Sequence, residues 1–585
     1  MMQRTRRIVP LLAMTILAAF APRVLAAESP VTVFVAKKII TMDPGWPAGT
    51  AVAVQDGKVL SVGTLDDLKP WLDGREHKVD RTFADKILLP GLIEPHGHAI
   101  IGGASLTRPL LTYLPTPSPY GPPFPGVKTH EEATTKLREY IAKAKSPDAT
   151  VLAWGYDVIA MGGKHLDKTI LDKVSATQPL LVWDASEHFV YANSAALKKY
   201  KVGREDTKLN GVMAGPDGEP NGQFLGITAA QRIMQTPLSE LLQPDVALTN
   251  IRYLMDLGRR NGITTTSDLA FGAIDIGLET VLLDRFFNDP NGSTRCVAIT
   301  DATVLTETKG TAAIDYAQKL TGRNTDRLIF RGVKFFADDA FLSMSMVIEN
   351  PGYTDGRKGI FNTPRDEMVE TWLPWWQAGF HIHVHTNGNG GNQATIDALD
   401  GLMKAHPRFD HRFTFQHYGI STPEQARRIK ALAGIVSVNP FYVYYRSEFT
   451  APYIGSDRAY TAARLKTLVD AGVPTSLHAD TPVAPPLPLE EVWIAVNRFG
   501  LSGQVRGPAE RVTVDQALRM VTIDAAYTLG VEDRVGSITA GKFADFTVLD
   551  QDPYDVPKEK IRDIPIWGTV LGGKVFPASE IKGPR

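Results

Sequence analysis

Residues 88–98 read LLPGLIEPHGH, which combines an apolar run, the turn pair Pro90-Gly91 and two histidines one residue apart. Side chains at positions i and i+2 of a strand lie on the same face, so His96 and His98 can reach one ion together. A lone histidine pair is common by chance. Its place after an apolar run favours a metal site, because a parallel α/β barrel carries its active site at the carboxyl ends of its strands.

A second group of histidines lies in residues 381–389, HIHVHTNGN. Its three histidines alternate, so spacing alone does not choose between them. His385 is the last and lies beside the glycine-containing loop, which makes it the best ligand candidate. His381 and His383 are the candidates for buried or supporting positions inside the barrel, and for His381 we expect that role rather than ligation.

Two further apolar runs end in metal-binding side chains. Residues 412–419, RFTFQHYG, place His417 at a strand end, and residues 472–483, GVPTSLHADTPV, place Asp480 at another. A carboxylate beside a bound metal can accept the proton of an attacking water. Four such strand ends in one chain predict a shared metal centre.

A lysine also interrupts an apolar run. In residues 330–339, FRGVKFFADD, Lys334 lies where lysine is rarely buried without a partner. It can form a salt bridge to Asp338 or Asp339, or extend its amine outward. Alternatively, it can carry a carboxylate added from carbon dioxide, which would bridge two ions. The sequence leaves these alternatives open.

Apolar strand-like runs alternate with helix-like stretches such as PEQARRIKALAG through the middle of the chain. Such alternation is typical of α/β proteins with a parallel sheet. We predict a (β/α)8 TIM-like barrel over residues 89–529, with a loop-rich insertion at about residues 104–230. The strand candidates are ATVLAWG, PLLVWDA, GITTTSDLA, FRGVKFFAD, FHIHVHT, RFTFQH, GIVSVNP and GVPTSLHAD.

Both ends of the predicted mature chain have strand character. Residues 31–63 hold β-branched residues around Asp56-Gly57, a tight-turn signal between paired strands. Residues 535–550, VGSITAGKFADFTVLD, have the same character. We predict that residues 31–88 and 530–585 meet in one small β-sandwich domain.

The first 26 residues have the plan of a secretory signal peptide. Three arginines, Arg4, Arg6 and Arg7, precede an apolar run, and small residues surround a cleavage site near Ala26. We expect a periplasmic or secreted protein that has no membrane segment after cleavage, with an uncleaved anchor as the alternative. The pair Arg6-Arg7 suggests the twin-arginine route.

Composition limits the remaining choices. The 585-residue chain has a net charge of -1 and no basic patch with interleaved aromatic residues, so we expect no nucleic-acid partner. Its single cysteine, Cys296, cannot form an internal disulfide or a cysteine-pair zinc site. Any metal must therefore be held by nitrogen and oxygen ligands.

Taken in order, these segments resemble the amidohydrolase superfamily. LLPGLIEPHGH, GVKFFADD, AGFHIHVHTNGN, QHYGISTPEQ and ADTPV are similar to its amidohydrolase-3 branch, which includes N-substituted formamide deformylase-like and YtcJ-like proteins. The resemblance covers nearly the whole mature chain. It implies one or two divalent ions, expected to be Zn²⁺, and N-carboxylation of Lys334. The implied metal ligands are His96, His98, Lys334, His385, His417 and Asp480.

The resemblance also assigns roles near the metal. EHFVYAN is similar to a substrate-side segment, so His188 is expected to contact a developing oxyanion, with a structural role as the alternative. Asp480 is expected to be the catalytic proton acceptor. Three departures from the branch pattern, at Asp339, Asn389 and Ala479, leave the ligand set intact but weaken any inference about the substrate.

The function predicted is an exported, metal-dependent hydrolase that cleaves an amide-like C–N bond of a small molecule. A single-ion deaminase is the nearest alternative, although Gly388 stands where the deaminases compared carry a glutamate. Lactone or ester hydrolysis would use the same groups. A non-catalytic periplasmic protein that binds a metal or ligand is the alternative from another class. A homodimer is the expected assembly.

Overall fold

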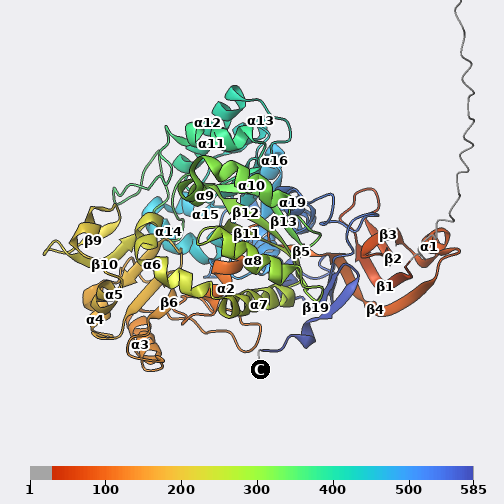
Figure 1. Ribbon diagram of the computed structural model, residues 1–585. Helices are drawn as coiled ribbons and strands as arrows, with labels where there is room; N and C mark the ends of the chain where they lie inside the picture. Colours follow the sequence, from red (N-terminus) through yellow and green to blue (C-terminus); the bar gives the residue numbers. More distant parts are fainter. Residues whose placement is uncertain (1–28, 584–585) are drawn as a thin grey trace, which may run out of the picture.

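The computed structural model describes residues 29–583. Three sheets lie side by side in Figure 1, with the largest in the middle, between a sheet of inserted strands and a sheet that joins both chain ends. The predicted signal peptide, residues 1–26, lies outside the described residues. Among the residues described, no helix is both long and apolar enough to cross a membrane.

The central sheet has eight strands, and every neighbouring pair is parallel. Its two edge strands are joined just past their carboxyl ends, where Asp480 N–H donates to the His96 carbonyl at 3.0 Å and His98 N–H donates to the Thr481 carbonyl at 3.1 Å. The predicted (β/α)8 barrel is therefore confirmed. Its strands are β5 (Leu92–Ile93), β11 (Ile263–Phe271), β12 (Arg295–Asp301), β13 (Leu328–Phe336), β14 (Ile382–Thr386), β15 (Thr414–His417), β16 (Ile435–Val438) and β17 (Thr475–Leu477).

Helices follow the barrel strands along the chain. Helix α13 shows why: Thr422 caps its first turn, Gln425 completes a reciprocal capping box, and Pro423 occupies the first position, where no backbone N–H is needed. The main helices are α7 (Pro244–Arg260), α8 (Ile276–Phe287), α9 (Ala302–Lys309), α10 (Ala313–Thr321), α11 (Met368–Gln377), α12 (Asn389–Ala405), α13 (Pro423–Ala431), α16 (Leu465–Ala471), α17 (Pro488–Asn497), α18 (Val514–Met520) and α19 (Ile523–Leu529).

Strand assignment differs from the sequence prediction at two places. The runs ATVLAWG and PLLVWDA form β6 (Val151–Tyr156) and β7 (Leu180–Asp184), which belong to a separate five-stranded sheet and not to the barrel. Conversely, the segment around Cys296 was not among the predicted strands, yet it forms the fully buried barrel strand β12.

The inserted sheet is built from β6, β7, β8 (Phe189–Ala192), β10 (Pro220–Leu225) and β9 (Val212–Ala214), in that order. Helix α2 (Ala99–Leu106) precedes this sheet and α6 (Ile227–Leu241) follows it. The turn between β7 and β8 is held by Asp184, whose carboxylate accepts from Ser186 Oγ and from the Phe189 backbone N–H. This turn carries His188 toward the barrel.

The predicted meeting of the two chain ends is observed. Strand β4 pairs with β1 on one side and with β18 on the other, so early and late segments share one seven-stranded sheet. The turn at Asp56-Gly57 connects β2 and β3, and both residues have positive φ, as a tight hairpin turn requires. The strands are β1 (Val31–Ile40), β2 (Ala48–Gln55), β3 (Lys58–Gly63), β4 (His77–Pro90), β18 (Phe546–Leu549), β19 (Ile566–Leu571) and β20 (Lys574–Pro577). The predicted domain limits stay predictions.

Candidate metal centre

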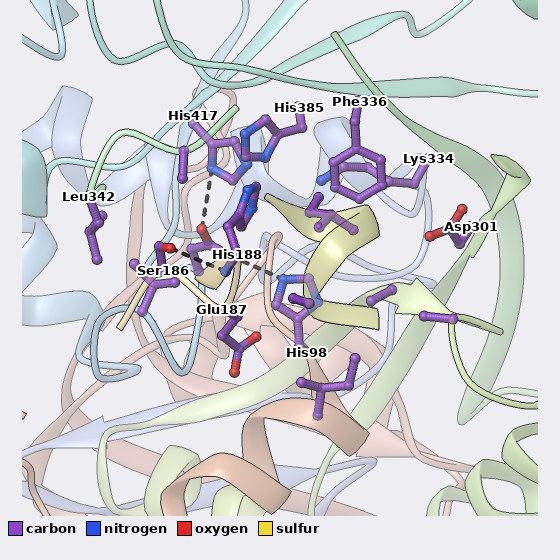
Figure 2. Close-up of a pocket in the computed structure, with 18 of the residues that line it drawn as sticks. His98, Ser186, Glu187, His188, Asp301, Lys334, Phe336, Leu342, His385 and His417 are labelled. Carbon is purple, nitrogen blue, oxygen red and sulfur yellow. Dashed lines mark hydrogen bonds and ion pairs between the residues drawn. The ribbon is translucent and has the colours of Figure 1, made fainter. Parts of the chain in front are cut away.

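The six side chains predicted as metal ligands line one cavity of about 170 Å³ at the carboxyl ends of the barrel strands. His96 and His98 follow β5, and Asp480 follows β17. Lys334, His385 and His417 lie on the neighbouring strands β13, β14 and β15. Figure 2 shows the rings of His385, His417 and His188 grouped together, with His98 and Glu187 below them in this view.

Asp480 is the carboxylate at the centre of this group. Its Oδ1 lies 3.1 Å from His98 Nε2 and 3.4 Å from His96 Nε2, and its Oδ2 lies 3.5 Å from His417 Nδ1. Burial alone would raise the pKa of Asp480, but its hydrogen bond with His98 and the surrounding positive groups hold that pKa below its ordinary value. The carboxylate is therefore ionised at neutral pH and able to accept a proton.

The buried imidazoles are mostly neutral. Burial, reinforced by neighbouring positive groups, lowers the pKa of His96 and His417 well below the usual range and that of His385 to about 3. His98 differs: burial lowers its pKa, but the Asp480 carboxylate, together with the carboxylates of Glu187 and Asp268, more than compensates, so the net shift is upward. A neutral imidazole offers a nitrogen lone pair, which is the form that binds a metal.

Lys334 is 1% exposed, and its Nζ lies 3.4 Å from His96 Nε2. Burial lowers its pKa to about 8. Within the described residues it forms no ion pair, because Asp338 accepts backbone N–H groups and Asp339 contacts His188 instead. The salt bridge that the sequence left open is therefore absent from residues 29–583.

Two backbone positions depart from regular strand geometry. His417 has φ of +73° and Asp480 has φ of +61°, a left-handed conformation that costs a non-glycine residue about 1–3 kcal/mol. Regular alternation would place Gln416 and His417 on opposite faces of β15. Instead, both reach His96: Gln416 through a hydrogen bond and His417 through ring contact at 4.5 Å between centroids.

Gln416 and His478 are supporting residues that the sequence analysis did not identify. Gln416 Oε1 lies 2.6 Å from His96 Nδ1, and its Nε2 lies 2.9 Å from His383 Nδ1. His478 Nε2 lies 3.1 Å from His417 Nδ1. Both supporting residues are fully buried. Their closeness in sequence to His417 and Asp480 was the available signal, because strand residues near a ligand often share its surroundings.

His381 and His383 lie outside the cavity lining. His383 is buried beneath the cluster as the partner of Gln416. His381 immediately precedes β14, and its carbonyl accepts from the Val333 backbone N–H. The expected non-ligand role of His381 agrees with this position.

His188 reaches the cavity from the turn between β7 and β8. Its Nδ1 contacts Asp339 Oδ1, and its ring lies 5.5 Å from that of His385. Burial lowers the pKa of His188, but the Asp339 carboxylate reverses the effect and the net shift is upward. His188 is thus oriented by a barrel carboxylate and held ready to donate a hydrogen bond.

The donor groups fit a divalent cation. One donor atom each from His96, His98 and Asp480 lie within 4.8 Å of one another, and so do donors from His96, His417 and His478. Two buried ring nitrogens, His98 Nδ1 and His417 Nε2, have no hydrogen-bond partner in the described part of the chain. Nitrogen and carboxylate donors grouped in this way are typical of zinc sites.

The rest of the cavity is largely apolar. Helix α6, which follows the inserted sheet, contributes one wall, and the turn before β8 contributes another. The apolar lining residues include Ile101, Trp183, Ile227, Met234, Leu238, Phe336, Phe341 and Leu342. A pocket with an apolar lining and a few convergent polar groups is typical of a small-molecule site.

The chain is similar to known proteins over most of its length. The sequence model of the amidohydrolase family matches residues 84–577. The chain is similar to Protein LONG AFTER FAR-RED 3 of Arabidopsis thaliana, with 26% identity over 546 residues, which cover 92% of this chain and 90% of that protein. It is also similar to N-substituted formamide deformylase of Arthrobacter pascens, with 23% identity over 555 residues, covering 91% and 96% of the two chains.

The fold is shared with a solved structure. The crystal structure of an uncharacterized metal-dependent hydrolase from Pyrococcus horikoshii aligns with a TM-score of 0.66 and 18% sequence identity. The alignment covers 90% of this chain and 99% of that one. The barrel and the sheet that joins the chain ends therefore belong to a known architecture.

Proposed function

The chain belongs to the amidohydrolase family and is a metal-dependent hydrolase of carbon–nitrogen bonds, and from this premise we propose that its substrate is a small N-substituted amide. The observation that carries the proposal is a cavity in which a cluster of metal-binding side chains meets a mainly apolar wall. A small amide with an apolar substituent fits this cavity, because its carbonyl group would face the metal-binding cluster and its substituent would contact the apolar wall. The full-length similarity to N-substituted formamide deformylase supports a formyl or short acyl group.

We propose that the metal ligands are the six residues predicted from the sequence. Zn²⁺ is the proposed ion, with one or two bound per chain. The amine of Lys334 is buried, has no ion-pair partner in the described residues, and has a pKa that burial lowers to about 8. This supports its N-carboxylation, because only the neutral amine attacks carbon dioxide. The proposed ligand set is His96, His98, Lys334, His385, His417 and Asp480.

A divalent ion held by these residues would supply Lewis acidity, which polarises a carbonyl oxygen and acidifies water. Asp480 would accept the proton of the attacking water and return it to the nitrogen of the leaving amine. His188 would donate a hydrogen bond to the oxygen on which negative charge develops, because Asp339 favours its protonated form. Gln416 would keep the ring of His96 in place.

The test is hydrolysis by purified protein supplied with Zn²⁺ and bicarbonate. N-alkylformamides, N-alkylacetamides, a γ-lactone and an aminopyrimidine should be offered in parallel, with formate, acetate, ring opening and ammonia as the readouts. We expect turnover of the amides, its loss after treatment with a chelator, and its return with Zn²⁺. Ammonia release from the aminopyrimidine alone, or ring opening alone, would refute the amide proposal.

We also propose that the protein acts in the periplasm or outside the cell. The arginines and the apolar run within residues 1–26 support export. Amino-terminal sequencing of protein from periplasmic and cytoplasmic fractions should find a new terminus near Ala27 in the exported fraction. An intact Met1 in exported protein would contradict cleavage. The homodimer stays a prediction, for which light scattering is the direct measurement.

A further inference from the structure

Glu187 is a cavity residue that the proposed reaction does not use. It lies between Ser186 and His188 in the turn before β8 and lines the same cavity as the proposed metal ligands. Figure 2 shows it below His188. Its φ of +63° is left-handed, a conformation that a non-glycine residue adopts at a cost, as His417 and Asp480 also do beside the same cavity.

The carboxylate of Glu187 has one partner. Its Oε1 accepts a hydrogen bond of 2.7 Å from Ser105 Oγ on helix α2. Ser105 itself is fully buried, so this bond holds the glutamate against the barrel. Within residues 29–583, its second oxygen, Oε2, forms neither a hydrogen bond nor an ion pair. The side chain is only partly buried, because it borders the cavity.

In the part of the chain described, no lysine or arginine forms an ion pair with this carboxylate. Lys334 is the only lysine or arginine that lines the cavity there, and its Nζ lies beside His96. The rings of His98 and His188 also lie near Glu187, but each is already bonded to another carboxylate, His98 to Asp480 and His188 to Asp339. Burial raises the pKa of Glu187 to about 7, and the nearby His98 and His188 rings offset that rise only in part.

A carboxylate in an apolar surrounding is costly unless it is paired with a cation. Here the protein fixes the position of Glu187 by a hydrogen bond and a strained backbone, yet leaves one oxygen open to the cavity. A ligand that brings its own positive charge would complete the pair, and a charge-assisted hydrogen bond is about twice as strong as a neutral one.

We propose that Glu187 is a specificity-determining residue that binds a protonated amino group of the substrate. The inference rests on the proposed function and narrows it to amides that carry a primary ammonium group a few bonds from the scissile C–N bond. The apolar wall would contact the carbon chain between the two groups. Glu187 would take no part in bond cleavage.

Two probes of similar length separate this idea from general amide hydrolysis. N-pentylformamide is neutral, whereas N-(4-aminobutyl)formamide carries an ammonium group at the position of the terminal methyl. Formate release measures both. For wild-type protein we expect kcat/KM to favour the amino probe by about ten-fold or more, mainly through KM. Glu187→Gln should reduce that ratio to about one.

The glutamine variant retains an acceptor for Ser105, so a purely structural tether would survive the substitution. Glu205→Gln is the matched control, because it removes a carboxylate from the exposed surface of the same inserted segment. The control should keep the wild-type ratio. Thermal unfolding of both variants should match that of the wild type.

Calorimetric titration of the same two probes into wild-type and Glu187→Gln protein reads binding directly. Tighter binding of the amino probe that depends on Glu187, without hydrolysis of either probe, would support this inference and refute the proposed function. Hydrolysis of both probes with no preference, or an equal loss for both in Glu187→Gln, would overturn the inference and leave the proposed function standing. Equal binding of the two probes, without hydrolysis of either, would overturn the inference about Glu187 and the proposed function together.

Discussion

Replacing Gln416 by methionine tests whether the residue beneath the cluster sets metal affinity. Methionine has a similar length but offers no amide, so the 2.6 Å contact with His96 Nδ1 and the 2.9 Å contact with His383 Nδ1 are both lost. Gln416 is fully buried, and a methionine side chain would occupy much of the same volume. His96 would then be left with a buried ring nitrogen that has no partner.

The magnitude follows from the cost of that unpaired nitrogen. Leaving a buried polar group unsatisfied costs about 1–3 kcal/mol, and each 1.4 kcal/mol corresponds to about ten-fold in affinity. Loss of a supporting hydrogen bond beneath a metal ligand typically lowers metal affinity about 10–100-fold. The two ranges agree. We therefore expect the Kd for Zn²⁺ to rise about 10–100-fold in Gln416→Met.

The assay is competition for Zn²⁺ against a coloured chelator, with Gln425→Met as the matched control. Gln425 is also a buried glutamine with two hydrogen bonds, to the Thr422 backbone N–H and the Asn389 carbonyl, but it caps helix α13 away from the cavity lining. The control should lose stability without losing metal affinity. An unchanged Kd in Gln416→Met, or an equal change in the control, would refute the reasoning.

The remaining predictions concern the proton acceptor, the lysine and acid stability. Asp480→Asn should lower kcat about 10²–10⁴-fold in a protein that circular dichroism shows to be folded, and near-normal turnover would exclude Asp480 as the proton acceptor. Lys334→Ala should reduce bound metal from about two ions per chain to about one by elemental analysis, and unchanged stoichiometry would reduce the lysine to a structural role. Burial alone would raise the pKa of Asp339, but contact with His188 lowers that pKa from 3.8 to about 2. The ionised Asp339 carboxylate therefore stabilises the fold above pH 3.8, and this stabilisation is lost as the pH falls toward 2. The free energy of unfolding of chelator-treated protein should therefore fall over that range, and this part of the pH dependence should be weaker in Asp339→Asn. The raised pKa of His188 gives a pH dependence of the opposite sign. Its contribution to folding stability is present below pH 6.5, the ordinary pKa of histidine, and is lost as the pH rises through the raised pKa.

Much of the proposed ligand set could be found from sequence because two local rules suffice. Alternation along a strand places His96 and His98 on one face, and the ends of parallel strands meet at one edge of a barrel. These rules do not depend on how distant segments pair. They therefore brought side chains from four strands into one predicted centre, and the family resemblance added Lys334 from a fifth. The structure places all of these side chains around one cavity.

Strand membership is harder to predict, because a buried strand of either sheet has the same apolar pattern. The runs that form β6 and β7 look like barrel strands, and only pairing with β8 and β10 assigns them elsewhere. The barrel strand β12 begins with Arg295, whose charge argues against burial. The Arg295 side chain forms an ion pair with Asp545, which lies 250 residues away in the sequence, with 2.6 Å between Arg295 Nε and Asp545 Oδ2. No local pattern reveals such a pair.

Backbone strain was also invisible in the sequence. Gln416 and His417 are adjacent, so alternation would let only one of them face the barrel interior. The left-handed conformation of His417 allows both to contact His96. Since such a conformation is unfavourable in isolation, it exists only where the surrounding fold imposes it. Sequence patterns that assume regular strands miss residues placed in this way.

The origin of each side chain explains why the chemistry could be predicted more readily than the substrate. The proposed ligands all come from barrel strands or from the residues that follow them, whereas His188 and Glu187 come from the inserted turn before β8. Hydrogen bonds connect that turn to its surroundings, from His188 to Asp339 after β13 and from Glu187 to Ser105 on helix α2. A different turn could therefore change what the cavity accepts while every proposed ligand stays in place. Amidohydrolases with the same strand ends but a different side chain at the position of Glu187 should bind metal equally well and choose different amides.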